Sequence, residues 1–400
     1  MNLLKGEKIT FTHLKPIENF KMKDEEINNK YIKGEVRIVT EQARYPLPSI
    51  IIMLSSGDYK LNPEFQRRHR WNKIQKSKLI ESFIMNVPIP PIFLYEDSFS
   101  HYEVMDGLQR LTAIKEFYSN EFELEGLEEW PELNGKKYSS LPIQIKKGID
   151  RRYLSSIILL QETAKNEIDA MKLKQLVFER INSGGVQLEP QESRNAVYNG
   201  RFNELCIKLA RNEFLCKTWN IPVQTSLEIE EDKLPDELIQ NDLFRSMRDV
   251  ELVLRFFANR QRNELIKYTN SLKSYLNNYL RYANLLPEST LKELSIVFED
   301  TMKFLYELLG EKAFYLYRER NGNWNWFSRP TTAVFDPLTL IASDFLESKD
   351  LILSKKDKIE DELKAFYQTN YSMFGGRNTN PGIITERERL IRDFFKKLTT

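Results

Sequence analysis

The 400-residue sequence has little histidine and little cysteine. Its three histidines are His13, His69 and His101, so the sequence after residue 101 cannot supply an HExxH motif or a histidine-metal nuclease cluster. The two cysteines, Cys206 and Cys216, have no companion histidine, which favours structural thiols over a zinc site. We therefore expect no metal site of this kind and a reducing, cytoplasmic location.

Long hydrophobic runs and a large excess of charge are also missing. No apolar run reaches the length of a membrane span, and the first residues lack the hydrophobic region of a secretory signal. Charged residues make up 29% of the chain and hydrophobic residues 41%, which is typical of globular domains, and the formal net charge is +1. A surface that binds nucleic acid would therefore have to be a local cluster of basic side chains.

The most informative stretch is residues 101–114, HYEVMDGLQRLTAI. Tyr102 and Val104 alternate as in a pleated strand, and the strand stops at the turn residues Asp106 and Gly107. After the glycine, apolar residues recur at helical spacing, namely at Leu108, Leu111, Ile114 and Phe117. The pattern predicts a strand that turns directly into a helix.

The polar residues of this turn are candidates for binding an anion. We expect Asp106 to cap the helix by accepting a backbone N–H. Gln109 and Arg110 fall in the first helical turn, where unpaired backbone N–H groups and the positive end of the helix dipole attract anions. Two interpretations stay open: a capped turn with two solvated polar side chains, or a phosphate site.

Two other segments carry polar residues of the same kind. Residues 62–71, NPEFQRRHRW, form a basic, aromatic-edged loop that suits phosphate contact, although such charge runs are also common on solvated surfaces. A predicted helix, capped by Asn166 and running to Ile181, ends at Asn182 and the pair Gly184-Gly185. Paired glycines usually mark a chain reversal, and they can also present backbone groups to a ligand.

The order of the predicted elements favours the α+β class. Short strands are expected at 92–95, 101–105, 122–124, 136–138 and 155–160. From residue 201 onward the periodicity is helical almost throughout, with a loop rich in aromatic side chains at 324–330. We predict three parts: an N-terminal arm outside the core (1–45), a small mixed-sheet domain (46–195) and a large helical domain (196–400).

Three motifs occur in a fixed order along the chain. They are Asn62-Pro-Glu-Phe-Gln-Arg67 followed by Trp71, Met105-Asp-Gly-Leu-Gln-Arg110, and Val177-Phe-Glu-Arg-Ile-Asn182 followed by Gly184-Gly185. Together these motifs resemble the N-terminal domain of GmrSD-type modification-dependent restriction proteins, which has a ParB/sulfiredoxin-like fold and an Asp-Gly-Gln-Gln-Arg signature. Segments 247–255 and 375–380 look like the helical part that follows in such proteins.

The resemblance implies a nucleotide-binding, DNA-associated component of an anti-phage or restriction system. It implies catalytic roles for Asp106, Gln109 and Arg110. The remaining residues of the implied nucleotide pocket are Gln66, Arg67, Arg70, Gly107, Asn182, Gly184 and Gly185. The implied cofactor is a nucleoside triphosphate, with Mg²⁺ held near its phosphates by Asp106 and a carboxylate such as Glu64.

The sequence departs from the family pattern in two places. Leu108 replaces the first Gln of the signature, and no histidine follows residue 101, whereas many relatives end in a histidine-based HNH nuclease domain. We therefore expect either a separate nuclease or ATPase effector, or a different activity in the chain itself. Three functions stay open: an NTP-hydrolysing sensor, a metal-dependent DNA nickase or nuclease that uses the same pocket, and a non-enzymatic DNA-binding adaptor.

Overall fold

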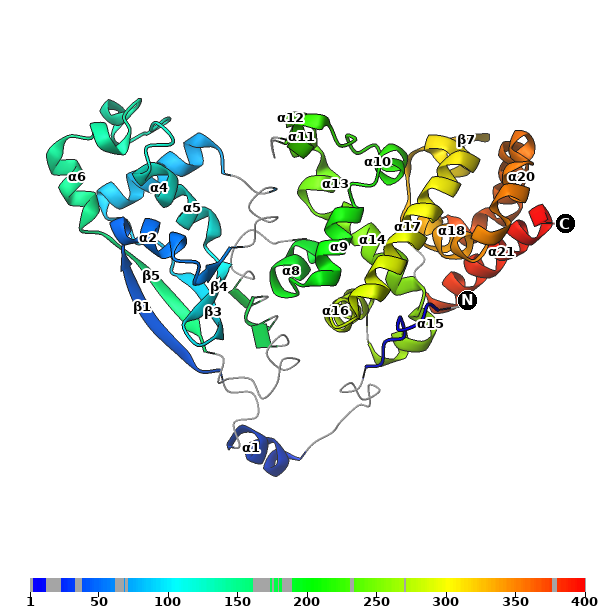
Figure 1. Cartoon of the computed structure of the whole chain (residues 1–400), viewed down its shortest axis with the longest axis horizontal. Coiled ribbons are helices and arrows are strands. Elements are labelled where there is room, and N and C mark those ends of the chain that lie inside the picture. The colour runs from blue at the N-terminus through cyan, green and yellow to red at the C-terminus, as the bar shows by residue number, and fades with distance from the viewer. Residues whose placement is uncertain are drawn as a thin grey trace. The chain divides into compact units, whose positions relative to one another are not determined.

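A computed structural model describes most of the chain. The described residues are 3–11, 23–32, 38–61, 68, 71–160, 173–174, 176–178, 180–181, 189–230, 234–269, 271–375 and 380–399. The chain divides into two compact units, one of residues Asn19–Asn199 and one of Met1–Glu18 with Gly200–Thr400. The first unit holds a mixed sheet and the second is mostly helical, so the predicted α+β class is confirmed (Figure 1).

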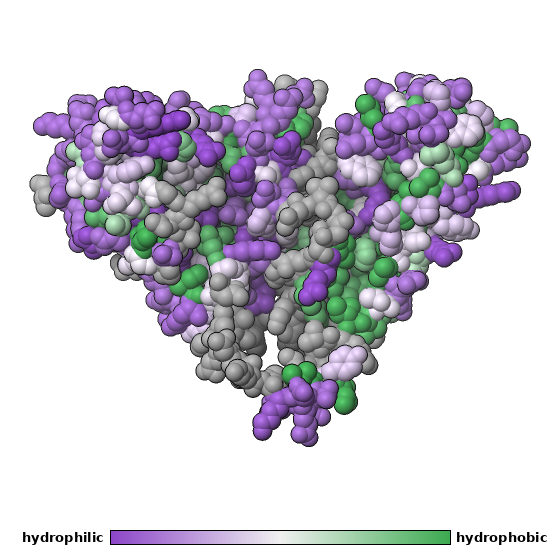
Figure 2. Space-filling view, turned by 180° about the vertical axis from the view of Figure 1, so that it is seen from behind, coloured by the Kyte–Doolittle hydropathy of each residue, from purple (hydrophilic) through white to green (hydrophobic). Residues whose placement is uncertain are grey.

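The surface is mainly polar. Hydrophilic residues cover most of the face shown in Figure 2, with smaller hydrophobic areas between them. Among the described helices, none combines the length and the apolar character that a membrane crossing requires.

The first unit is built on a sheet with the strand order β1-β5-β3-β4-β2. Its strands are β1 (Thr40–Pro46), β2 (Tyr59–Lys60), β3 (Ile92–Ser98), β4 (His101–Asp106) and β5 (Tyr153–Leu159). β1 with β5 and β3 with β4 are antiparallel pairs, whereas β3 with β5 and β4 with β2 are parallel pairs. The three inner strands β5, β3 and β4 therefore pair along both edges, and β4 leads directly into the turn at residues 106–107.

One face of this sheet is covered by helices (Figure 1). The main ones are α2 (Ile50–Ser55), α4 (Lys73–Met85), α5 (Leu108–Tyr118) and α6 (Ile143–Asp150). The unit also contains α1 (Asp24–Ile32), α8 (Pro190–Val197) and the 3-10 turns Leu47–Ser49, Pro131–Leu133 and Tyr138–Ser140. Ile92, Leu94 and Val104 on the strands pack with Leu108 and Leu111 of α5 in one buried core. The strand-to-helix turn is thus fixed by apolar contacts on both of its sides.

Two predictions about this unit are wrong. Segments 122–124 and 136–138 are not strands, although Leu124 exchanges two backbone hydrogen bonds with the 135–136 turn, because the contact is too short to extend into a ladder. β1 lies inside the segment that we expected to be an arm. Its sequence, TEQARYP, is polar because β1 is an edge strand whose side chains are mostly exposed.

The second unit consists of packed helices and one hairpin. Its helices are α9 (Arg201–Leu209), α10 (Glu213–Trp219), α11 (Ser226–Glu230), α12 (Asp236–Gln240), α13 (Asp242–Arg245), α14 (Arg248–Asn259), α15 (Arg262–Leu265), α16 (Leu272–Ala283), α17 (Glu288–Leu309), α18 (Thr332–Asp344), α19 (Lys349–Leu353), α20 (Lys356–Phe374) and α21 (Pro381–Thr399), with 3-10 turns at Ile266–Tyr268, Gly310–Lys312 and Leu346–Ser348. The hairpin is β6 (Tyr315–Arg320) and β7 (Asn323–Pro330). Buried aromatic rings such as Phe256, Phe257 and Phe298 join α14 to α17.

The aromatic segment 324–330 is a strand and not the expected loop. In β7 the ring of Trp324 stacks on Tyr317 and meets the edge of Tyr371, and Trp326 packs against Tyr367 of α20. Packing between elements is therefore the role of these tryptophans. The alternation of Trp324 and Trp326 at a period of two was the sign of a strand.

The N-terminal segment is a buried part of the helical unit and not a peripheral arm. The side chain of Glu7 is completely buried, and its carboxylate accepts hydrogen bonds from Arg260 at 2.5 and 2.8 Å. Gln261 forms two hydrogen bonds with the same segment: its side chain accepts from the N–H of Ile9 and donates to the carbonyl of Glu7. Phe11 then packs beside Tyr282. This docking depends on a partner 250 residues away, which local sequence patterns do not encode.

Removing the Glu7 carboxylate should destabilise the helical unit strongly. In Glu7→Ala the buried Arg260 guanidinium loses its counter-ion, and such a loss costs about 3–5 kcal/mol of unfolding free energy. Urea unfolding followed by circular dichroism measures the difference. The exposed pair Lys303–Glu307 provides the control, since Glu307→Ala should change stability little. Equal effects of the two substitutions would contradict a structural role for the N-terminal segment.

Candidate functional site

The turn between β4 and α5 requires a glycine. Gly107 has a φ of +97°, in the left-handed region, and α5 begins at the next residue. A Cβ atom at this position would lie 2.9 Å from the Cβ of Ile92 and closer still to its Cγ2. Both the backbone angle and the space therefore exclude a side chain here. Leu108, the departure from the family signature, is buried in the core and anchors the helix start.

The side chains of Arg110 and Asp106 form an ion pair across the turn. Arg110 Nη2 donates to Asp106 Oδ2 at 2.6 Å. The other arm of the guanidinium, Nη1, donates to the carbonyl oxygens of Pro90 and Pro91, just before β3. Burial lowers the pKa of Arg110, and the Asp106 carboxylate offsets only part of this effect. Arg110 thus holds the start of α5 against the entry of β3.

The predicted cap is wrong. Gly107 is the N-cap residue of α5, and no side chain caps this helix. Asp106 instead accepts from Arg110 at the i, i+4 position, because its backbone still belongs to β4. Among the described residues, no side chain accepts a hydrogen bond from the first N–H groups of α5, and free N–H groups of this kind bind anions at helix N-termini.

Gln109 connects the turn to the segment that follows the basic loop. Its Oε1 accepts a hydrogen bond from the N–H of Trp71 at 3.1 Å. Its Nε2 is buried and has no hydrogen-bond partner among the described residues. A buried amide donor without an acceptor is unfavourable unless a ligand or water supplies one. Gln109 is therefore the side chain of the motif best placed to donate to a bound oxyanion.

A buried ion pair connects the segment just before the third motif to strand β4. Lys174 lies four residues before the buried Phe178, and its ammonium group pairs with the Glu103 carboxylate on β4. The ammonium also lies 5.5 Å from the ring centre of Tyr95 on β3. We did not predict these residues. The one signal for Lys174 was its spacing from Phe178, which puts both on one helix face.

The structure brings together part of the predicted site. Asp106, Gly107, Gln109 and Arg110 lie within one turn, and Gln109 contacts the residue that follows the basic loop. The other predicted residues lie outside the described part of the chain, namely Gln66, Arg67, Arg70, Asn182, Gly184 and Gly185, together with Glu64. Within the described residues, no group of three or more His, Cys, Asp or Glu side chains could hold a metal ion.

The comparisons with known proteins agree with the motifs. Residues 50–199 match the family model described as GmrSD restriction endonuclease, N-terminal domain. This range contains the sheet from β2 onward, the 106–110 turn and α8. No curated protein and no solved structure matches the chain. The ParB/sulfiredoxin-like assignment therefore stays a prediction from the motifs.

Gly107→Ala should lower the free energy of unfolding by more than the cost of a left-handed backbone at a non-glycine residue. A left-handed non-glycine residue costs roughly 1–2 kcal/mol, and the overlap with Ile92 should add about 1–3 kcal/mol. Gly57→Ala is the matched control, because Gly57 has a similar φ of +84° but open space around its Cβ position. Denaturant unfolding of both variants measures the difference. Equal losses would show that the contact with Ile92 does not restrict this position.

Proposed function

Because residues 50–199 form a domain of the GmrSD restriction endonuclease N-terminal family, we propose that this chain is a DNA-associated component of a restriction or anti-phage defence system. In this proposal the chain binds and hydrolyses a nucleoside triphosphate at the 106–110 turn. It works in the cytoplasm with a separate effector protein that carries out the attack on foreign DNA.

The observation that carries the proposal is the connection of the three motifs to β4 and α5. Gln109 of the second motif bonds to Trp71, directly after the first motif, and Glu103 on β4 pairs with Lys174, just before the third. Residues next to the first and third motifs, 38 and 71 residues away in sequence, thus contact the β4–α5 segment. A phosphate site requires such convergence, because groups from several segments must surround the anion.

Each residue of the turn then has a distinct task. The uncapped N–H groups of α5 bind phosphate oxygens, and the Nε2 of Gln109 donates to an oxygen of the transferred phosphoryl group or to the attacking water. Arg110 and Asp106 keep the turn in place through their mutual hydrogen bond. The proposal also assigns nucleotide contacts to the motif residues outside the described part of the chain, namely Gln66, Arg67, Arg70, Asn182, Gly184 and Gly185.

A magnesium ion fits this proposal as a partner of the nucleotide. Mg²⁺ is usually held by one or two carboxylates together with substrate phosphates and water. Asp106 lies in the chain directly before the N-cap residue of α5, and its Oδ2 is bonded to Arg110. When bound, the ion would neutralise charge that develops on the phosphates.

Gln109→Glu tests the proposal with the smallest structural change. The glutamate keeps an oxygen that accepts from Trp71 N–H, but it replaces the Nε2 donor by a negative charge. We expect the melting temperature to stay close to that of the unsubstituted chain, and nucleotide binding to weaken roughly tenfold or more, because a charged hydrogen bond becomes a repulsion. Calorimetric titration and a hydrolysis assay over a panel of nucleotides, with and without DNA, measure the effect.

Gln144→Glu, on the exposed surface of α6, is the control with the same change of charge. Unchanged binding and turnover in the Gln109 variant would remove this side chain from the site. Nicking of plasmid DNA without nucleotide would favour the nickase alternative. DNA binding without any nucleotide binding would favour the adaptor.

A further inference from the structure

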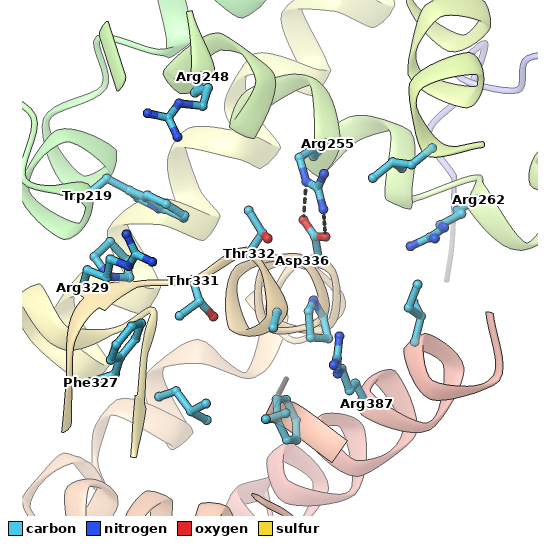
Figure 3. A pocket seen from close by; sticks show the side chains of 18 of the residues that line it. Trp219, Arg248, Arg255, Arg262, Phe327, Arg329, Thr331, Thr332, Asp336 and Arg387 are labelled. Atoms are coloured by element: carbon cyan, nitrogen blue, oxygen red, sulfur yellow. Dashed lines mark hydrogen bonds and ion pairs between the residues drawn. The ribbon is translucent and has the colours of Figure 1, made fainter. Parts of the chain in front are cut away.

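The helical unit contains a large cavity that belongs to no predicted site. Its volume is about 1310 Å³, and it lies between the start of α14, the β6–β7 hairpin, α18 and α21 (Figure 3). This exceeds the roughly 300–1,000 Å³ typical of small-ligand pockets. All of its lining residues belong to the helical unit.

The cavity is strongly basic. Among the described residues that line it, Asp336 is the one carboxylate, and it is paired with Arg255 through two hydrogen bonds. Burial opposes the charge of Arg255, but the attraction of Asp336 and Glu251 outweighs it and raises the pKa of Arg255. The other basic side chains are Arg248, Arg262, Lys267, Arg318, Arg329 and Arg387. No lining carboxylate remains to neutralise these six.

Two of these guanidinium groups are almost completely buried. Arg262 is 8% exposed and forms no ion pair with a described carboxylate, while Asp336 and Glu388 act on it from a greater distance. Arg387 is 5% exposed; its Nε donates to the carbonyl of Met373, but its Nη2 has no partner among the described residues. Burial lowers the pKa of both arginines. A buried cation without a counter-ion indicates that an anion is supplied from outside.

The accessible side of the cavity presents cations beside an aromatic ring. The guanidinium of Arg318 lies 3.8 Å from the ring centre of Phe327, and that of Arg329 lies 5.5 Å from it. Trp219 faces the same space in Figure 3. A basic groove with aromatic rings is the usual arrangement for binding a nucleic-acid strand without reading its sequence.

We propose that this cavity binds a segment of a single nucleic-acid strand, with phosphates on its unpaired arginines and a base against Phe327. The arrangement of the charges favours a strand over a single phosphate. Figure 3 shows Arg248, Arg262, Arg329 and Arg387 on different sides of the Arg255–Asp336 pair. Cations spread in this way match an extended polyanion, which carries one charge per nucleotide.

Removal of the accessible cations tests the proposal without disturbing the core. In the full chain, the double variant Arg318→Ala/Arg329→Ala should bind a fluorescein-labelled oligothymidine about tenfold more weakly or worse. The slope of log affinity against log salt should fall by roughly 1.4, at about 0.7 per lost phosphate contact on a single strand. Fluorescence anisotropy at several salt concentrations, without nucleotide, gives both quantities.

Arg320→Ala is the matched control, because Arg320 lies exposed on the same hairpin and outside the cavity lining. Binding by the double variant equal to that of the control would overturn the proposal. Competition by inorganic phosphate or a free nucleotide that is as strong as competition by an unlabelled strand would also overturn the proposal, since the cavity would then hold a small anion. The assay needs no nucleotide turnover, so its outcome is independent of the 106–110 turn.

A second pair of variants tests the buried charge directly. Arg262→Met removes a buried cation without an ion pair, so the melting temperature of the free protein should stay the same or rise, while oligothymidine binding weakens. Arg255→Met removes the partner of Asp336, so its melting temperature should fall. A fall in Arg262→Met as large as that in Arg255→Met, or undiminished strand binding, would show that Arg262 is structural and would overturn the proposal.

Discussion

The close approach of Gly107 to Ile92 is the constraint on which the first unit depends. It lets β4 turn into α5 within one residue, and it puts Arg110 within reach of Asp106 and of the Pro90 and Pro91 carbonyls. The same turn leaves the first N–H groups of α5 uncapped and directs Gln109 toward Trp71. The backbone conformation of this turn therefore supports both the fold of the first unit and the candidate phosphate site. A side chain at position 107 would disturb both.

Arg110 and Gln109 are neighbouring polar residues of the same motif, but the structure gives them different roles. Arg110 donates to three acceptors within the unit, whereas the buried Nε2 of Gln109 has no acceptor among the described residues. The signature suggests its arginine as the anion ligand, but the amide of Gln109 is the better candidate for ligand contact. The arginine positions the turn that presents it.

Charge is distributed unevenly in spite of a net value of +1. In the helical unit, seven basic side chains and a single carboxylate line one cavity, among the residues described there. They come from elements that span residues 248 to 387. A balanced overall charge is therefore compatible with a concentrated basic site, and only the packing of distant helices produces that concentration.

The sequence by itself determined the local features: the strand at 101–106, the helix from Leu108, the need for glycine at 107, the α+β class and the motifs of the family. These depend on periodicity and backbone sterics within a few residues, which short stretches encode fully. The tertiary structure decided what depends on distant partners. Residues 4–11 became part of the helical core through the ion pair of Glu7 with Arg260. The polar strand β1 joined the sheet edge by pairing with β5, and Lys174 paired with Glu103. The tertiary structure also gathered the arginines of the helical unit around one cavity, because side chains far apart in sequence meet only when the helices pack.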